Sequence, residues 1–203
     1  MRLGIFLFIT FFLFPYRIFF QESDWKLEKN QAGIQVYTRL VEDLPYKAFR
    51  AIVEINCDTR RLIQELKDIQ SFPKWYHMLT SGDRFEQLSE DEGYCYITLD
   101  MPWPVSDRDN VFHYQWEYFP AENRVFMTSE SRSDYRPAKA AYIRIPYSLS
   151  TWEIISLGPE KVRLIHEAQA DPGGSIPSWL ANSFVTDGPY KSLFNLRKRI
   201  EEE

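Results

Sequence analysis

The sequence predicts an α+β domain in which a curved antiparallel sheet packs against one long C-terminal helix. Three observations support this fold class. Segments that alternate apolar and polar residues, as half-buried strands do, fill much of the chain between residues 33 and 170. Turn signals such as Asp91-Glu92-Gly93 separate these segments. After residue 171 the alternation gives way to apolar residues at helical spacing.

The first part of the chain mixes helical and strand patterns. We expect a short amphipathic helical turn at 25–30 and an amphipathic helix over 59–69, with Asp58 as its N-cap and Glu65 on its outer face. The aromatic segment Phe72 to His77 is expected to form a short helix or turn on the sheet. The expected strands are 33–39, 47–56, 84–88, 94–101, 110–119, 124–131, 140–145, 151–157 and 161–170.

The C-terminal helix has its own start and interruption signals. Ser175 is a good N-cap, and Pro177 falls in the first turn, where its missing N–H costs nothing. A helix of about 25 residues would be roughly 37 Å long. Gly188-Pro189 predicts a kink or short break after Asp187, and Asp187 would then cap the second half.

Composition limits the classes of function. The chain has 203 residues, 44% of them hydrophobic, which supports a single domain with a real core. A net charge of −5 provides no global attraction to nucleic acid, so no nucleic-acid partner is expected. Separately, we expect the protein to be a monomer. Two cysteines, Cys57 and Cys95, are too few for a disulfide scaffold. They could form one bridge or remain two buried thiols.

The first twenty residues differ from the rest. One arginine precedes about twelve mainly apolar residues, the pattern of a secretory signal, but no small-residue cleavage site follows. A retained membrane anchor is the alternative, although Arg17 shortens the apolar run. We therefore divide the chain into a signal peptide or anchor (1–20) and a folded domain (21–203). The domain is expected to be exported to the periplasm or anchored at the membrane.

Several inward-facing strand positions combine an apolar body with a polar tip. They include Tyr96 and Thr98 on one expected strand, Tyr114 on the next, and His166 on the last. A solid core usually favours aliphatic residues, because each buried polar tip needs a partner. Pockets for amphiphilic ligands use such mixed linings. On periodicity alone, a ligand cavity and a core with satisfied polar tips remain equal alternatives.

Five stretches of the sequence resemble one known family. MPWPVSDRDNV (101–111), DPGGSIPSWLAN (171–182) and FVTDGPYKSLFNL (184–196) occur in the family's order, and GIQVYTR (33–39) and FPKWYH (72–77) fit as well. Together they resemble the START (steroidogenic acute regulatory protein-related lipid transfer) domain family, in a bacterial member, over residues 25–200. The resemblance implies a helix-grip fold, in which a U-shaped antiparallel sheet grips the C-terminal helix around an internal tunnel. It also implies noncatalytic binding and carriage, or sensing, of a lipid or other hydrophobic molecule, with transient membrane contact.

The resemblance and the strand pattern together suggest which residues line the tunnel. Arg108 lies between two carboxylates and is expected to clamp the 102–107 loop through a bidentate pair. Some sterol-binding members carry an acid–base pair in the cavity, and none is evident here, which argues against a sterol. The predicted cavity residues are Trp75, Tyr96, Thr98, Met101, Trp103, Arg108, Tyr114, Met127, His166, Leu180, Ser183, Phe184 and Asp187.

The sequence offers little for catalysis. His77, His113 and His166 lack a second ligand at metal-binding spacing, so neither a metal nor a cofactor is expected. The chain contains no G-x-S-x-G, P-loop or G-x-G-x-x-G pattern. An aromatase/cyclase-like or hydrolase-like enzyme with His166 as its base is the alternative, because a catalytic cavity needs a base within reach of the ligand.

Overall fold

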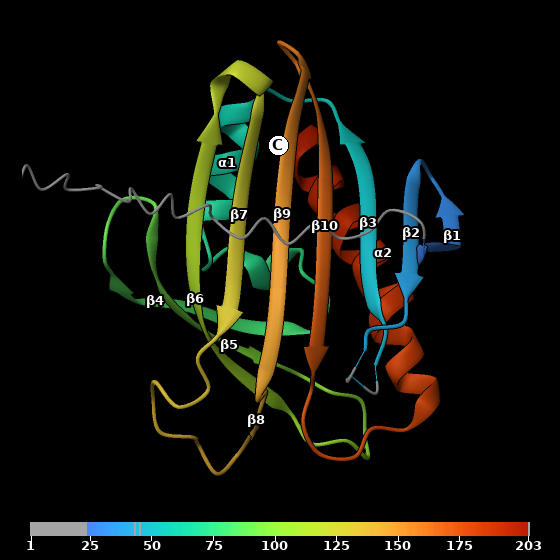
Figure 1. Ribbon diagram of the computed structural model, residues 1–203, viewed down its shortest axis with the longest axis vertical. Helices are drawn as coiled ribbons and strands as arrows, with labels where there is room; N and C mark the ends of the chain where they lie inside the picture. The colour runs from blue at the N-terminus through green and yellow to red at the C-terminus, as the bar shows by residue number, and fades with distance from the viewer. Residues whose placement is uncertain (1–23, 43, 45, 203) are drawn as a thin grey trace, which may run out of the picture.

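The computed structural model describes residues 24–42, 44 and 46–202, and one strongly curved sheet dominates it (Figure 1). The ten strands of this sheet follow the spatial order β1-β2-β3-β10-β9-β7-β6-β5-β4, with β8 paired to β6. The strands are β1 (Lys26–Gln31), β2 (Ile34–Arg39), β3 (Ala48–Ile55), β4 (Leu79–Gln87), β5 (Glu92–Leu99), β6 (Arg108–Phe119), β7 (Arg124–Ser131), β8 (Ile143–Arg144), β9 (Tyr147–Gly158) and β10 (Lys161–Asp171).

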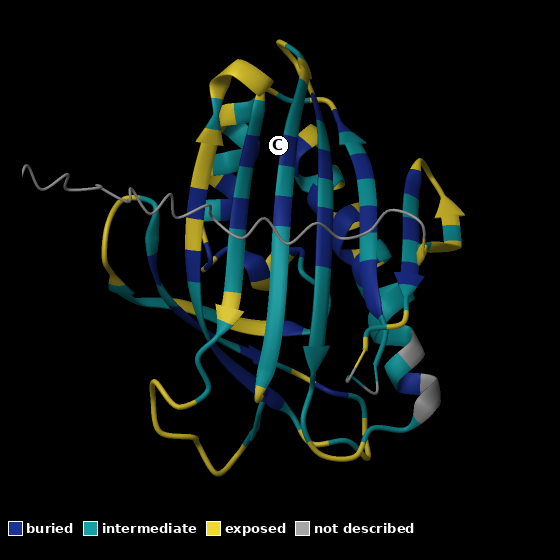
Figure 2. Ribbon diagram, viewed as in Figure 1, coloured by how far each residue is buried: buried dark blue, intermediate teal, exposed yellow. Residues whose placement is uncertain are grey.

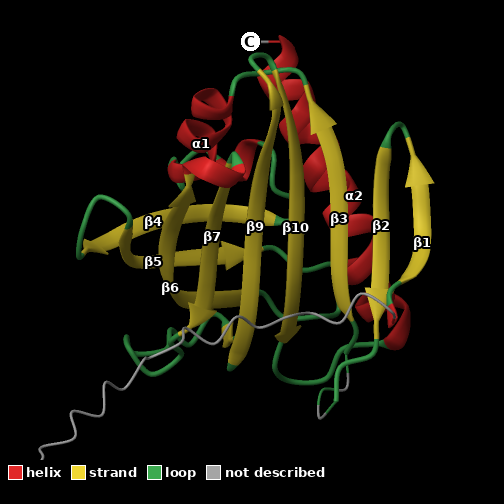
Figure 3. Ribbon diagram, turned by 45° about the horizontal axis from the view of Figure 1, so that its top comes forward, coloured by secondary structure: helices red, strands yellow, loops and turns green. Residues whose placement is uncertain are grey.

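Neighbouring strands pair antiparallel, apart from the short parallel pair β6 and β8. The sheet bends so far that β4 and β5 run across the molecule while β9 and β10 run along it (Figure 3). One face is therefore concave, and the remaining elements fill that concave side.

Two helices cover the concave face. The helix α1 (Thr59–Lys67) is capped by Asp58, whose carboxylate accepts a hydrogen bond from the Arg61 N–H at 2.8 Å. The C-terminal helix α2 (Ser178–Glu202) packs along β2 and β3. The short 3₁₀ turns η2 (Phe72–Lys74) and η3 (Pro120–Glu122) lie between these elements. The predicted fold class, a curved antiparallel sheet around a long C-terminal helix, is confirmed.

A fully buried part of the core lies where the second half of α2 approaches α1. Leu62 of α1 and Leu193 and Leu196 of α2 are completely buried there, and so is Leu164 of β10. Figure 2 shows the same buried band running across the central strands. This core fixes the C-terminal half of α2 on the sheet.

Some element boundaries differ from the prediction. Residues 26–31 form an edge strand instead of a helical turn, because they pair with β2 from Lys26 opposite Thr38 onward. The expected strand at 140–145 shortens to β8, and the expected strand at 84–88 extends back to Leu79. Tertiary pairing outweighs the local pattern in each case.

The helix α2 departs from its predicted start and break. It begins at Ser178 instead of after Ser175, since the Pro177 carbonyl accepts the N–H groups of Leu180 and Ala181. It also continues through Pro189 without interruption. The helix packs along β2 and β3, and this tertiary packing offsets the backbone hydrogen bond that proline cannot make.

Glu65 is the clearest error in the prediction for α1. It is 5% exposed, whereas the pattern placed it on the outer face. Its carboxylate accepts hydrogen bonds from the Ser71 hydroxyl at 2.7 Å and from the Arg199 guanidinium at 2.8 Å. A buried carboxylate thus joins α1 to the end of α2, which sequence spacing could not reveal.

The described part of the chain contains no helix that is both long and apolar enough to cross a bilayer. The predicted signal peptide or anchor at 1–20 lies outside the described residues. Cys57 and Cys95 are free thiols. Burial raises the pKa of Cys57 to about 11 and that of Cys95 to about 12, so both remain protonated at neutral pH.

Candidate functional site

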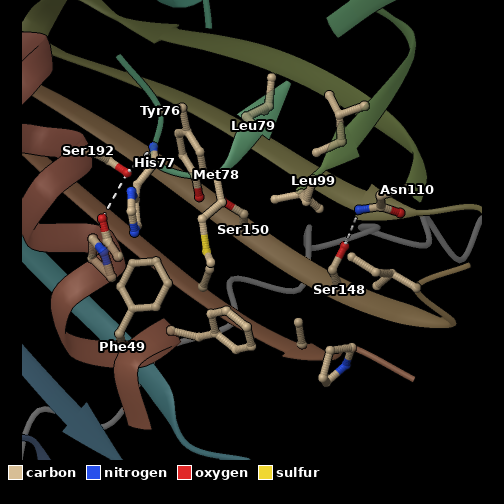
Figure 4. Close-up of a pocket in the computed structure, with 18 of the residues that line it drawn as sticks. Phe49, Tyr76, His77, Met78, Leu79, Leu99, Asn110, Ser148, Ser150 and Ser192 are labelled. Atoms are coloured by element: carbon tan, nitrogen blue, oxygen red, sulfur yellow. Dashed lines mark hydrogen bonds between the residues drawn. The ribbon is translucent and has the colours of Figure 1, made fainter. Parts of the chain in front are cut away.

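A cavity of about 260 Å³ lies between the concave face of the sheet and the first half of α2 (Figure 4). Its floor is formed by β3, β10, β9, β7, β6 and β5, and its roof by α2 together with the segment from Ile69 to Leu79. Its volume is slightly below the ~300–1,000 Å³ of typical small-molecule sites. Within the described residues it is the site best suited to a ligand.

Apolar side chains form most of the wall. The apolar and aromatic lining residues include Phe49, Ile69, Phe72, Tyr76, Met78, Leu79, Ile97, Leu99, Met101, Phe112, Met127, Ile145, Leu149, Trp152, Phe184 and Val185. Small residues widen the space where larger ones would close it. These are Ala168 and Ala170 on β10, and Ala181 and Gly188 on α2.

A group of polar side chains crosses this apolar lining, and we call it the polar row: Asn110, Ser129, Ser148, Ser150 and His166. Strand register explains its position. Ser129 of β7 is the cross-strand partner of Ser150 of β9. The Asn110 amide donates to the Ser148 hydroxyl at 2.9 Å, but the Asn110 carbonyl oxygen is buried without a partner. The polar row therefore retains unused hydrogen-bonding capacity.

His166 is the deepest member of the polar row and is 1% exposed. Its ring stacks on Trp152 with 3.6 Å between ring centroids, and Phe49 meets it edge-on at 4.9 Å. Nε2 lies 3.1 Å from the Ser150 hydroxyl, while Nδ1 is buried without a partner. Burial lowers the pKa of His166 to about 3, so the ring is neutral at physiological pH.

Arg108 closes the end of the cavity at which α2 begins. It is 1% exposed, and its guanidinium donates to the carbonyl oxygens of Pro172 at 3.3 Å, Gly173 at 2.9 Å and Ser106. It therefore joins the 100–107 loop to the turn before α2, as a clamp should. Burial lowers the pKa of its guanidinium, which nevertheless stays charged.

The predicted bidentate pair between Arg108 and a neighbouring carboxylate is wrong. Asp109 points away from it and instead binds Arg144, with Oδ1 2.8 Å from Nε and Oδ2 3.0 Å from Nη2. The Tyr96 hydroxyl also donates to Asp109, at 3.0 Å. Adjacent residues of a strand face opposite sides of the sheet, so Arg108 reaches the cavity while Asp109 serves the outer face.

Five of the predicted cavity residues line the space: Met101, Arg108, Met127, His166 and Phe184. Their role in ligand contact stays a prediction. Met127 and His166 share a register row, since both are cross-strand partners of Trp152.

The structure places Tyr96 and Thr98 on the outer face of β5. The inward residues of this strand are Ile97 and Leu99, one position out of phase with the prediction. Thr98 instead meets the hydroxyls of Thr80 at 2.8 Å and Ser81 at 2.6 Å. Loops and a neighbouring strand bury this outer face, so both faces of β5 carry buried residues and burial alone could not indicate its phase.

The other predicted residues also lie away from the cavity wall. Three of them are buried without lining the cavity: Trp75, Tyr114 and Leu180. Trp75 and Tyr114 pack into the core beside the cavity. Trp103 is 90% exposed. Ser183 does not line the cavity, and the Asp187 carboxylate turns outward to Lys29 at 2.6 Å. The unbroken helix needs no internal cap, so the predicted capping role of Asp187 is wrong.

Sequence reasoning missed most of the polar row. Serines in strands give weak signals, and only His166 was predicted from this group. One signal was available, because inward side chains of two adjacent strands become smaller in the same direction. Leu164, His166 and Ala168 of β10 show the trend, which β9 repeats with Trp152 and Ser150.

Comparison with known proteins agrees with this geometry. The START domain family model matches residues 17–203. An uncharacterised protein of Pseudomonas aeruginosa is 35% identical over 180 residues, covering 89% of this chain and 88% of that protein. The solved STAR-related lipid transfer protein of Xanthomonas axonopodis is 32% identical with a TM-score of 0.80, covering 88% of this chain and 99% of that one. Mouse phosphatidylcholine transfer protein is 27% identical over 187 residues, covering 88% of this chain and 85% of that protein. The chain belongs to the START domain family.

Proposed function

We propose that this protein binds one lipid-like molecule in the cavity and carries it without making or breaking covalent bonds. The supporting observation is an apolar space between sheet and helix that the protein's own side chains leave unfilled. Burying one methylene contributes about 0.8 kcal/mol, so a chain of about ten would contribute about 8 kcal/mol. The names of the Xanthomonas and mouse relatives, both lipid or phosphatidylcholine transfer proteins, support the same class of ligand.

For a ligand to enter, the end of the cavity at the start of α2 must open. Gly173 and Gly174 form the turn before α2, with positive φ values of 69° and 64° that favour glycine. Both glycines lie against the side chain of Ile143. We propose that this turn is the hinge on which the start of α2 moves while its second half stays in the core.

The same end of the protein carries a surface suited to a membrane. Trp103 is 90% exposed on the loop that follows Met101, and Leu40 is 82% exposed on the loop before β3. Both loops contribute residues to the cavity wall, Met101 from one and Tyr46 from the other. Tryptophan favours the membrane–water interface, so we propose that these loops touch the bilayer during ligand exchange.

The proposed location depends on residues 1–20. We propose that they direct the domain out of the cytoplasm, as a cleaved signal or a retained anchor. The intact mass of the native protein separates the two cases, and an unprocessed protein in the cytosolic fraction would contradict both.

A matched pair of variants tests ligand binding. Ser129 faces the cavity from β7 and Thr128, next to it, faces outward. Ser129→Phe should fill the cavity and strongly reduce the lipid that copurifies with the protein, measured by mass spectrometry of an organic extract. Thr128→Phe adds a ring of the same size outside and should leave copurified lipid unchanged. Equal extraction from both variants, or only background lipid from the unmodified protein, would contradict the proposal.

One observation favours a catalytic use of the cavity. Ser150 and His166 form a hydroxyl–imidazole pair at 3.1 Å, the arrangement of a nucleophile and its base. The buried Nδ1 has no carboxylate to orient the ring, and a pKa of about 3 makes His166 a weak base. His166→Gln separates the two functions, because an enzyme would lose turnover whereas a carrier would still extract lipid.

A further inference from the structure

The described residues that line the cavity carry charge of only one sign. They include Arg108 and Lys47 but no aspartate or glutamate. The nearby carboxylates lie outside the wall and accept hydrogen bonds from backbone groups: Asp107, which also attracts Arg108 electrostatically, accepts from the Met101 N–H at 2.9 Å, and Asp171 accepts from the Gly173 N–H at 2.9 Å. A cationic head group would find no counter-charge in this wall, whereas an anionic one would.

Of the two cations, Arg108 should bind an anion more strongly. It is 1% exposed, and its three hydrogen-bond acceptors are backbone carbonyl oxygens, none of them a carboxylate. A guanidinium has five N–H donors, so two remain beyond these three bonds. Asp107 attracts Arg108 only through space, and partial charges on carbonyl groups do not neutralise a buried cation as a hydrogen-bonded carboxylate would, so an anion hydrogen-bonded to Arg108 would be stabilised.

The second cation and a hydroxyl lie at the same end. Tyr46 interacts electrostatically with Arg108, and Lys47 follows Tyr46 in the chain and also lines the cavity. Lys47 is 38% exposed and only loosely paired, with 3.6 Å between its ammonium and the Glu28 carboxylate. These groups lie at the end that the proposed hinge would open, where a ligand's head group would remain after its tail had entered.

The polar row begins next to this cationic end. Asn110 lies two residues from Arg108 on β6 and faces the same side, with an unpartnered carbonyl oxygen. Outside the polar row most of the wall is apolar, and the volume of about 260 Å³ suits one hydrocarbon chain better than two. The charge of the wall therefore favours an anionic head group, and the volume of the cavity favours a single chain.

We propose that the ligand is a single-chain amphiphile with an anionic head group, a carboxylate or a phosphate monoester, which Arg108 binds while the chain lies along the apolar wall. This inference rests on the proposed function, since it assumes that the cavity holds a ligand, and it names the ligand's chemical class. Lys47 adds attraction at the opening, and Asn110 can accept a hydrogen bond from a protonated head group or a neighbouring hydroxyl.

A series of ligands with one chain and different head groups tests the proposal. Hexadecanoate, hexadecyl phosphate, hexadecanol and hexadecyltrimethylammonium are each titrated below micelle-forming concentrations against a neutral fluorescent chain bound to the full-length protein. The anionic members should bind at least about tenfold more tightly than hexadecanol, and the trimethylammonium compound should bind most weakly. The ratio between the two anions distinguishes a carboxylate ligand from a phosphate ligand.

Variants assign the preference to one residue. Arg108→Gln should reduce the anion preference, the ratio of anion affinity to hexadecanol affinity, to about twofold or less, whereas Arg108→Lys should keep part of it. Arg124→Gln is the control, since Arg124 pairs with Glu153 on the opposite face of the sheet and should keep the full preference.

The outcomes separate this inference from the proposed function. Hexadecanol or the trimethylammonium compound binding as tightly as the anions would overturn the inference and leave the carrier function intact. Failure of every member to bind would overturn the carrier function itself. If Arg108→Gln does not fold, as circular dichroism would show, the head-group series on the unmodified protein still decides.

Discussion

The two ends of the space under the sheet are built from the same strands and the same helix, yet one is solid and the other hollow. At the solid end, Leu164 of β10 aligns with Ile154 of β9, and both are completely buried. Two rows further along, Ala168 aligns with Ser150, and both line the cavity. His166 and Trp152 form the row between them.

The helix α2 repeats this contrast along its length. Leu193 and Leu196 in its second half have no exposed surface, whereas Ala181 and Gly188 in its first half border the cavity. The hollow is thus made by reducing side-chain size along an otherwise continuous interface, without a change of backbone architecture. A native interior leaves few voids, so this loss of volume costs stability that the solid end must supply.

The largest expected effect comes from removing the same side chain at each end. Leu164→Ala at the solid end should lower the free energy of unfolding by about 2–5 kcal/mol, because it leaves a new cavity in a packed region. Leu99→Ala on the cavity wall should lower it by about 1 kcal/mol, since that side chain already borders empty space.

Urea unfolding followed by tryptophan fluorescence measures both values. An equal loss in the two variants would mean that the cavity end is packed as tightly as the core, and the contrast between the ends would be lost.

The row between the two ends should show the effect of pH. Burial lowers the pKa of His166 to about 3, whereas in the unfolded chain it titrates near 6.5. The unfolded state therefore binds more protons below pH 6.5, and stability should fall as the pH drops from about 6.5 toward 3. The slope approaches ~1.4 kcal/mol per pH unit at its steepest.

His166→Gln cannot take up this proton and should flatten the slope between pH 6.5 and 4.5. His113, which lies beside the Glu92 carboxylate at 2.8 Å, offers the matched variant His113→Gln. A flattened slope in the His113 variant and an unchanged one in the His166 variant would contradict the assignment.

The smallest difference in unfolding free energy is expected between two ion pairs that hold α2, one near each end of the helix. Burial by itself raises the pKa of Glu65, but hydrogen bonds from Ser71 and Arg199 outweigh it and lower the pKa below its usual value. The stabilisation is present above the unfolded-state pKa and is lost as the pH falls through the lower folded-state pKa. Glu65→Gln should cost about 1–2 kcal/mol at pH 7.

Asp187→Asn is the corresponding change at the hollow end. The side chain of Asp187 is 46% exposed, and its pair with Lys29 should contribute between 0 and about 0.5 kcal/mol. Chemical denaturation at pH 7 in low and high salt separates the two pairs, because only the exposed one should respond to salt. A larger loss from Asp187→Asn would reverse the proposed order.

The strands and helices were predictable to different degrees, for reasons that particular residues show. Alternation located β2, β7 and β10 almost to the residue, since one face of each is buried and the other is solvated. On β5 the same approach chose the wrong face, because loops bury the outer side and Tyr96 binds Asp109 there. Glu65 failed for a similar reason, since its partner Arg199 is far away in the sequence.

By itself, the sequence determined the order of the elements from β2 onward, the N-cap at Asp58, the inward face of β10 and the family. These depend on local chemistry or on motifs that can be read along the chain. Only the tertiary structure decided that β5 shows Ile97 and Leu99 to the cavity, that α2 runs unbroken through Pro189, and that Arg108 binds carbonyl groups instead of a carboxylate. Each of these depends on which distant atoms fill the remaining volume and satisfy the remaining charges, and that is settled only when the sheet closes around the helix.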